Sequence, residues 1–267
     1  MILWIFFILL GTVVGTLSGL FGIGGGVLMV PAIYLSLKSI GMEDYQALIV
    51  GTRTSLAIIL FTSLSSTLGH NKRSPLRWDI IKELSLFVVI GTILGSLIVH
   101  LISAPVLKGI LMGYIFVIAV KMWLGFKPRP GDHAQKPPMI LNALVGIIIG
   151  LKSAVLGIGG GTISIPYLQW QNVKMAHAAG ISAFLGTIIA LTGTFTGLLQ
   201  ETSLAISNNQ LGDIFLPALF GISSTSLFFA RVGAKLSHRV DQQKLRKGFA
   251  LFLFLITMRN VYSLFVS

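Results

Sequence analysis

The chain has 267 residues and a mass of 28.7 kDa; 54% of the residues are hydrophobic, only 10% are charged, and the mean hydropathy is +0.88. Charged residues make up about a quarter of an ordinary soluble domain, so this composition excludes both a water-soluble fold and a disordered chain. A net charge of +12 would suggest nucleic acid as partner of a soluble protein. In a membrane protein it is expected from basic cytoplasmic loops, so we expect a lipid bilayer as partner and no nucleic acid. The chain has no cysteine, which excludes disulfides, thiolate catalysis and cysteine metal sites.

Eight apolar runs predict membrane helices, the shorter ones extended by flanking Lys and Arg. In chain order they cover residues 2–20, 45–69, 84–99, 109–120, 139–156, 175–199, 214–230 and 248–265. The first run has no basic residue before it and no small-residue cleavage site after it, so we interpret it as a membrane helix rather than a signal peptide. None shows the alternation of barrel strands. The sequence therefore predicts an all-α polytopic membrane protein.

A glycine motif occurs twice. Residues 15–31 and 150–166 align at an offset of 135 with eight identical positions. Both copies contain Gly-Ile-Gly-Gly-Gly, at 22–26 and 157–161, followed by Pro31 and Pro166. The duplication predicts two membrane repeats, residues 1–125 and 138–267, that form one integrated transmembrane domain. Residues 126–137, rich in proline and charge, are predicted to be a cytoplasmic linker.

The basic residues predict how the two repeats are oriented. Four Lys and Arg lie in residues 72–82, four in 121–136 and six in 231–247, whereas residues 199–213 have none. By the positive-inside rule the first three segments are cytoplasmic and the last is outside. Segments 72–82 and 199–213 follow equivalent helices of the two repeats. Equivalent loops on opposite faces predict inverted repeats.

The inversion requires that the glycine motif turns the chain back within the membrane. Only about ten apolar residues follow each motif, at 27–37 and 162–170, which is roughly 15 Å of helix and too short to span. We therefore expect each repeat to be a glycine-broken hairpin, a helix plus a half-helix, followed by three spanning helices. Both termini would then lie outside.

The glycine motifs are the candidate binding element. Interrupted helices at matching places in two halves indicate a transporter site, and the free N–H groups of a half-helix form a site for an anion. The alternative is that the glycines only allow close helix packing. The candidate substrate-binding residues here are Ser18, Gly22, Gly24, Gly25 and Gly26 in the first half and Lys152, Ser153, Gly157, Gly159, Gly160, Gly161 and Thr162 in the second. We expect no catalytic residue, metal site or cofactor.

Three cations interrupt apolar runs, at Arg53, Lys152 and Arg259. A charge in hydrocarbon costs several kcal/mol and requires a partner, a water-filled cavity or a ligand. Because no Asp or Glu lies in mid-span, an anionic substrate is the simplest counter-charge, and the guanidinium fork of Arg53 suits an oxyanion. Lys152 is interpreted equally well as a ligand or as a helix-end cation that reaches the interface, and Arg259 as structural.

The two copies of Gly-x-x-Ser-x-x-x-Gly-x-Gly-Gly-Gly-x-x-x-x-Pro, each opening a half of about 130 residues of hydrophobic helices, resemble the sulfite exporter TauE/SafE family. The resemblance covers essentially the whole chain. It implies transport of sulfite, sulfonates or related organosulfur anions across the bacterial inner membrane. The family often has a Thr-Ser pair just inside the second helix. Here the matching places read Gly51-Thr52-Arg53 and Gly180-Ile181-Ser182, which adds Thr52 and Ser182 to the candidate binding residues and makes Arg53 a candidate selectivity residue.

The resulting hypothesis is a multi-pass secondary transporter of the cell inner membrane, not an enzyme, that exports a small sulfur-containing anion by alternating access. A second copy of the chain, in a homodimer, is a further candidate partner. The alternatives are an anion channel and a membrane assembly factor without transport activity. The lack of a polar cluster at one face disfavours a membrane enzyme, and the lack of acidic or cysteine ligands in the spans disfavours a metal-cation permease.

Overall fold

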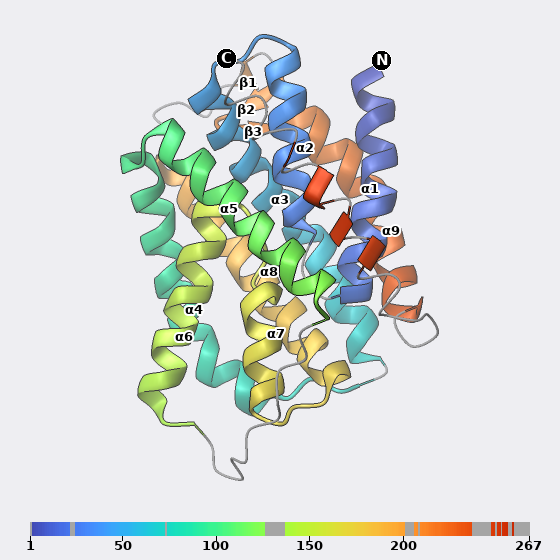
Figure 1. Ribbon diagram of the computed structural model, residues 1–267, viewed down its shortest axis with the longest axis vertical. Coiled ribbons are helices and arrows are strands. Elements are labelled where there is room, and N and C mark those ends of the chain that lie inside the picture. Colours follow the sequence, from blue (N-terminus) through green and yellow to red (C-terminus); the bar gives the residue numbers. More distant parts are fainter. Residues whose placement is uncertain are drawn as a thin grey trace.

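The computed structural model describes residues 2–21, 25–72, 74–125, 137–200, 206–207, 209–236, 247–248, 250–251, 253–255 and 258, and these are nearly all helical (Figure 1). Seven of the described helices are long and apolar enough to cross a membrane. They are α1 (Ile2–Phe21), α3 (Asp44–Asn71), α4 (Trp78–Ile98), α5 (Ala104–Trp123), α6 (Met139–Leu156), α8 (Met175–Gln200) and α9 (Leu216–Leu236). The polytopic all-α prediction is thereby confirmed for seven of the eight runs. The last run, 248–265, lies mostly outside the described residues.

Two shorter helices follow α1 and α6. They are α2 (Gly26–Ser39) and α7 (Gly161–Trp170), with 14 and 10 residues. At 1.5 Å per residue they are about 21 and 15 Å long, which is less than a hydrocarbon core of about 30 Å. The half-helices expected after the glycine motifs are therefore present.

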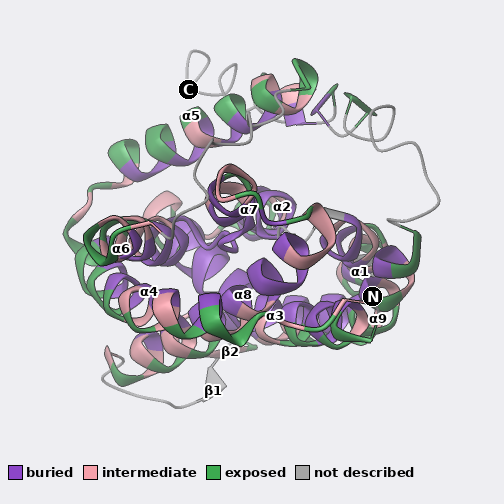
Figure 2. Cartoon of the chain, turned by 90° about the horizontal axis from the view of Figure 1, so that it is seen from below, coloured by how far each residue is buried: buried purple, intermediate pink, exposed green. Residues whose placement is uncertain are grey.

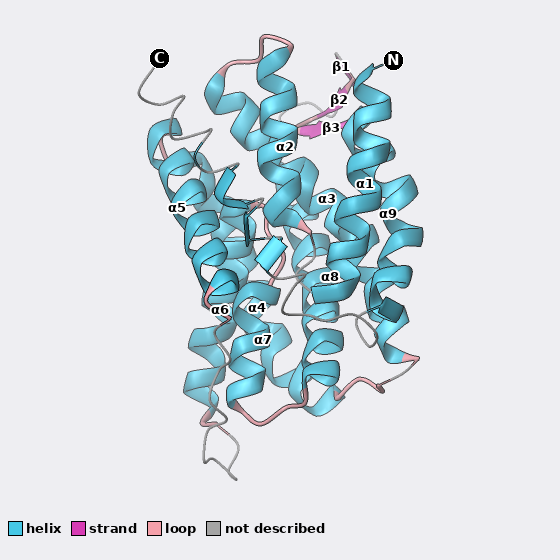
Figure 3. Cartoon of the chain, turned by 45° about the vertical axis from the view of Figure 1, so that its right-hand side comes forward, coloured by secondary structure: helices cyan, strands magenta, loops and turns pink. Residues whose placement is uncertain are grey.

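Each short helix runs antiparallel to the long helix that follows it. At the start of α2, Gly26 lies against Ile59 in the middle of α3, and further on Tyr34 lies beside Gly51. In the same way Gly160, before α7, lies against Ile189 of α8. Thus α2 and α7 both begin near the middle of the bundle, and they run toward opposite ends of it (Figures 1 and 3).

Small residues bring two further helix pairs into close contact. On α1, a β-carbon at Gly15 would lie 2.6 Å from the Cα of Ser226 on α9. On α4, a β-carbon at Gly91 would lie 2.7 Å from the Cα of Ile147 on α6, and one at Gly95 would lie 2.9 Å from the Cα of Leu151. Such approaches are how membrane helices associate without a hydrophobic driving force between them. The first helix of each half thus packs on the fourth helix of the other half.

The buried centre of the bundle is formed by α3 and α8, which pack on each other between these two pairs (Figure 2). Most of α3 is buried, including hydroxyl side chains along its length. Ser63 Oγ of α3 and Thr187 Oγ1 of α8 lie 3.0 Å apart and form one hydrogen bond across the interface. Because α2 and α7 lie along α3 and α8, the packing of these two long helices positions the glycine motifs.

The sequence prediction was wrong in one respect, since it contained no strand. A three-stranded antiparallel sheet of β1 (Ile206–Ser207), β2 (Gln210–Leu211) and β3 (Ile214–Phe215) precedes α9. Asn209 and Gly212 adopt positive φ values of 64° and 56° and form its turns. The backbone N–H of Phe215 in β3 donates to Thr54 Oγ1 at 2.8 Å, so a side chain of α3 provides the hydrogen-bond acceptor for this strand N–H. Helix α9 therefore begins at Leu216, two residues after the start of the expected run at residue 214.

Candidate functional site at the two glycine breaks

Each glycine motif lies where one described helix ends and the next begins. Helix α1 ends at Phe21 and α2 begins at Gly26, an interval that we call the first break. Helix α6 ends at Leu156 and α7 begins at Gly161, which defines the second break. Gly25 and Gly157 have φ values of 73° and 63°, a left-handed conformation that favours glycine. The candidate residues Gly22 and Gly24 lie outside the described residues.

The two breaks are in direct contact. A β-carbon at Gly26 would lie 2.5 Å from the carbonyl oxygen of Gly157 and 2.8 Å from the Cα of Ile158. One at Gly157 would lie 2.7 Å from the Cα of Thr52 on α3. Ser55 Oγ donates to the same Gly157 carbonyl at 2.7 Å. Any larger side chain at Gly26 or Gly157 would therefore separate the two halves where they meet.

Two serines beside the breaks have buried hydroxyls. Ser18, near the end of α1, and Ser153, near the end of α6, are 1% and 0% exposed. Their Oγ atoms have no hydrogen-bond partner among the residues that the structure describes. The backbone carbonyl of Ser153 accepts from the N–H of Ile158 at 3.2 Å and so helps to end α6. Both candidate serines thus lie near helix ends with buried hydroxyl groups, and their role as substrate ligands stays a prediction.

A polar cluster lies at the second break. Lys152 Nζ of α6 donates to the carbonyl of Gly159 and to Thr162 Oγ1 of α7, each at 3.1 Å. Thr162 Oγ1 also hydrogen-bonds to the hydroxyl of Tyr114 on α5. Lys152 Nζ lies 5.1 Å from the centre of the Tyr114 ring, a cation–π geometry. The Lys152 ammonium thus lies against the second glycine motif, and its role as a ligand stays a prediction.

Arg53 lies elsewhere on α3, where it contacts polar groups of α4 and α8. It is 3% exposed and donates to the carbonyls of Ser96 on α4 and Gly193 on α8, at 3.1 and 3.3 Å. Its Nη2 also donates to Gln200 Oε1 at 2.7 Å and lies 3.0 Å from His100 Nε2. None of these four residues belongs to a glycine motif. The guanidinium thus joins α3 to α4 and α8.

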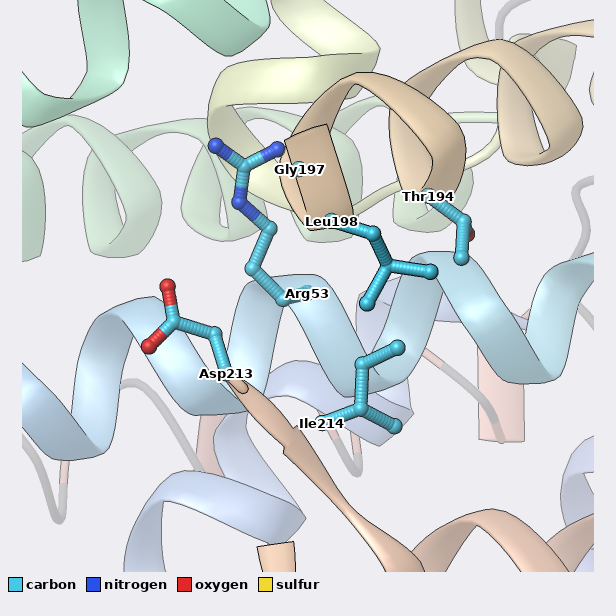
Figure 4. A pocket seen from close by; sticks show the side chains of 6 residues that line it. All are labelled: Arg53, Thr194, Gly197, Leu198, Asp213 and Ile214. Atoms are coloured by element: carbon cyan, nitrogen blue, oxygen red, sulfur yellow. The ribbon is translucent and has the colours of Figure 1, made fainter. Parts of the chain in front are cut away.

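A small pocket follows the side chain of Arg53, with a volume of about 10 Å³, which is space for about one water molecule. Figure 4 shows Arg53 reaching past Gly197 of α8, with Asp213 on the strand side. A β-carbon at Gly197 would lie 2.8 Å from Arg53 Nη1, so glycine at this position makes room for the guanidinium. The pocket is too small for an oxyanion with several oxygens.

The other candidate residues on α3 and α8 are buried. Thr52 Oγ1 donates to the carbonyl of Ile49 in its own helix at 2.8 Å, while its Cα forms part of the contact with Gly157. Ser182 accepts a hydrogen bond from Ser164 of α7 at 3.0 Å and so ties α7 to α8. Arg259 lies outside the described residues. Among the residues that the structure describes, no group of three potential metal ligands occurs.

The family model described as "Sulfite exporter TauE/SafE" matches residues 7–260. The chain belongs to the TauE/SafE family. A probable membrane transporter protein of Haemophilus influenzae is 29% identical over 252 residues, which cover 94% of this chain and 95% of that protein. One of Methanocaldococcus jannaschii is 29% identical, over 90% of this chain and 88% of its own length. The probable membrane transporter YunE of Bacillus subtilis is 23% identical over 97% of both chains. No solved structure is significantly similar.

Membership of the TauE/SafE family and seven apolar helices together identify a multi-pass membrane protein of a family of probable transporters. The relatives are named as transporters, and no catalytic activity is indicated for them. Their names state neither a substrate nor a direction of transport.

Sequence reasoning missed three polar residues of this TauE/SafE protein. Tyr114 was part of an apolar run, and His100 was one of several histidines at helix ends. Gln200 ends α8 without belonging to a motif. Tyr114 could have been found as a polar-tipped side chain in mid-helix, since a buried tyrosine hydroxyl needs a partner. The contacts of His100 and Gln200 with Arg53 depend on helix packing that no local pattern reveals.

Proposed function

We propose that the protein is a secondary transporter that moves a small sulfur-containing oxyanion, such as sulfite or a sulfonate, across the inner membrane. The observation that carries the proposal is the contact between Gly26 and Gly157. It places the start of the first half-helix, α2, against the turn that precedes the second half-helix, α7, and the N–H groups of half-helix starts favour an anion. The proposed binding residues are the candidates in and beside the two breaks, together with Thr52, Arg53 and Ser182. Arg53 contributes mainly through its charge, since its hydrogen bonds go to α4 and α8.

Alternating access is proposed to arise from inverted repeats. Three features support the inversion: the opposite directions of α2 and α7, the reciprocal packing of α1 on α9 and α6 on α4, and the basic segments predicted to be cytoplasmic. Rocking of one half against the other around the contact of the two breaks would expose the site to each side in turn.

Export is the direction that the membrane potential favours. With a negative interior, each negative charge that leaves the cell gains about 2.3 kcal/mol per 100 mV. The sequence has no Asp or Glu in mid-span to form a proton relay. A dianion could therefore leave without a coupled ion, which favours an uncoupled carrier.

Flux measurements in liposomes test this proposal. Purified protein is reconstituted with sulfite inside, and efflux is recorded under an imposed potential that is negative inside, with protein-free liposomes as control. We expect saturable efflux that rises with the potential and is accelerated by sulfite on the opposite side. Flux that follows a pH gradient but ignores the potential would contradict the uncoupled mechanism. Flux without saturation or trans-stimulation would indicate a channel, and an absence of flux would favour an assembly factor.

A further inference from the structure

Helix α5 lies to one side of the bundle, on the side of α2 and α7 (Figure 2). It contacts the region of each half-helix through a polar side chain. Near its start, Lys108 Nζ lies 3.5 Å from Asp44 Oδ2 of α3 and 5.5 Å from the ring of Tyr34 on α2. In its middle, Tyr114 contacts Thr162 at the beginning of α7. No motif of the sequence marks Tyr114, yet its hydroxyl reaches the second break.

Hydrogen-bond donors converge on Thr162 from three helices. Lys152 Nζ comes from α6, the Thr162 hydroxyl from α7 and the Tyr114 hydroxyl from α5. Lys152 Nζ and the Tyr114 hydroxyl each lie within hydrogen-bond distance of Thr162 Oγ1. They surround the N-terminal end of α7, where backbone N–H groups add further donors.

The two hydroxyls of this cluster have more hydrogens than their mutual bond uses. If Tyr114 donates to Thr162, the hydroxyl hydrogen of Thr162 is not used in this bond. If Thr162 donates to Tyr114, the hydroxyl hydrogen of Tyr114 is not used in it. Lys152 supplies only donors, and the one carbonyl bonded to the cluster, that of Gly159, accepts from Lys152. Among the described residues, no further acceptor is bonded to either hydroxyl. The cluster therefore lacks an acceptor, which is what an anion supplies.

We infer that Tyr114 is a substrate-binding residue whose hydroxyl donates to an oxygen of the transported anion beside Lys152 and Thr162. The inference rests on the proposed function and makes it more specific, because it assigns the polar contacts to the second break and to α5. The ligand that fits is a small oxyanion with at least two acceptor oxygens, one for Lys152 and one for the hydroxyl pair. A single-atom anion such as chloride cannot receive these donors in the same way.

Replacing Tyr114 by phenylalanine tests the assignment, because Tyr114→Phe retains the ring beside Lys152 and removes only the hydroxyl. In liposomes we expect the KM for sulfite to rise about five- to tenfold, the effect of losing one hydrogen bond, with little change in the maximal rate. The KM for chloride, if chloride is transported, should stay within twofold.

A matched variant controls for general effects. Tyr45→Phe removes a tyrosine hydroxyl that donates to the carbonyl of His100 at 3.3 Å, away from the breaks, and should leave the KM for sulfite unchanged. Sulfite binding to purified protein, measured by calorimetry, gives a second readout that does not depend on transport.

A wild-type KM for sulfite in the Tyr114→Phe variant would overturn the role of Tyr114 while leaving the proposed function intact. So would an equal rise of KM for sulfite and chloride, which would show a purely structural role. Failure of the wild-type protein to bind or transport any oxyanion would overturn both. A selective loss of sulfite affinity in Tyr114→Phe, with Tyr45→Phe unchanged, supports the inference.

Discussion

The two glycine breaks have the same backbone motif and different side chains. At the offset of 135 residues, Lys152 of the second half corresponds to Leu17 of the first, and Thr162 corresponds to Val27. The second break is flanked by a lysine and a threonine, and this threonine contacts Tyr114 of α5. Beside the first break, Val27 belongs to the hydrophobic core and Leu17 packs against this core. The glycines are shared, whereas the polar side-chain contacts found among the described residues belong to the second break.

This difference separates two requirements of a binding site between repeats. The shared glycines allow the backbones to touch, as at Gly26 and Gly157, and this contact must be kept on both sides. The side chains need not match, so one half can specialise in polar contacts with the anion while the other supplies packing. The comparison leads to four predictions, given from the largest expected effect to the smallest.

Gly157→Ala tests the shared backbone contact. The added β-carbon would lie 2.7 Å from Thr52 Cα, at a positive φ that alanine rarely adopts, so we expect a loss of about 3 kcal/mol or more in the free energy of unfolding. The yield of monodisperse protein and its thermal unfolding measure the effect. Gly109→Ala on α5, where a β-carbon meets nothing within 4 Å, is the matched control. Equal behaviour of the two variants would refute the tight contact of the breaks.

Arg53→Gln tests whether the buried cation of α3 belongs to the packing rather than to the break cluster. It removes hydrogen bonds to the carbonyls of Ser96 and Gly193, so we expect a stability loss of about 2–4 kcal/mol, seen as a lower thermal midpoint. Sulfite affinity should fall by less than in a Lys152 variant. An unchanged thermal midpoint with abolished binding would instead make Arg53 the principal ligand.

Lys152→Met makes the second break resemble the first. Loss of a charged donor from the anion site should weaken sulfite binding by about 10- to 100-fold, since hydrogen bonds to charged groups contribute about 1.5–3 kcal/mol. Calorimetric titration measures the affinity. Leu17→Met makes a change of similar size at the corresponding place in the first break and should leave the affinity within twofold. Comparable losses of sulfite affinity in both variants would contradict the assignment of the polar contacts to the second break.

Thr162→Val should have the smallest effect. It replaces the threonine by the residue found at the corresponding position 27 and removes one neutral hydroxyl, so we expect a rise in KM of about fivefold, or about 1 kcal/mol. Steady-state flux of sulfite measures it. The reverse change, Val27→Thr, should not improve the KM, because no lysine accompanies it in the first break. An improved KM there would show that the first break binds the anion as well.

Much of the fold could be predicted from the sequence because a bilayer permits few structures. Apolar runs must be helices, and runs of about ten residues after a glycine motif must be half-helices. The start of α4 and both ends of α5 extend beyond their predicted runs, since turns at the membrane interface include polar residues such as Asp79 and Lys121. The small sheet before α9 was missed because its two-residue strands leave no period to detect.

The sequence could predict the part of the candidate site that lies within or next to the glycine motifs. The glycines, Ser18, Ser153, Lys152 and Thr162 lie at or beside the breaks because they are close to them in sequence. The surroundings of Arg53 and the approach of Tyr114 depend on which helices pack together. That packing is set by interfaces such as Gly91 against Ile147, whose partners lie far apart in the chain.

Sulfite binding to the double variant Lys152→Met/Thr162→Val, compared with the wild-type protein by calorimetric titration, tests the central claim most directly. This variant gives the second break apolar side chains like those of the first and leaves every glycine in place. We predict that the wild-type protein binds sulfite and that the double variant binds it at least about 50-fold more weakly while remaining monodisperse. Equal affinity in the two proteins would contradict an oxyanion site at the second break.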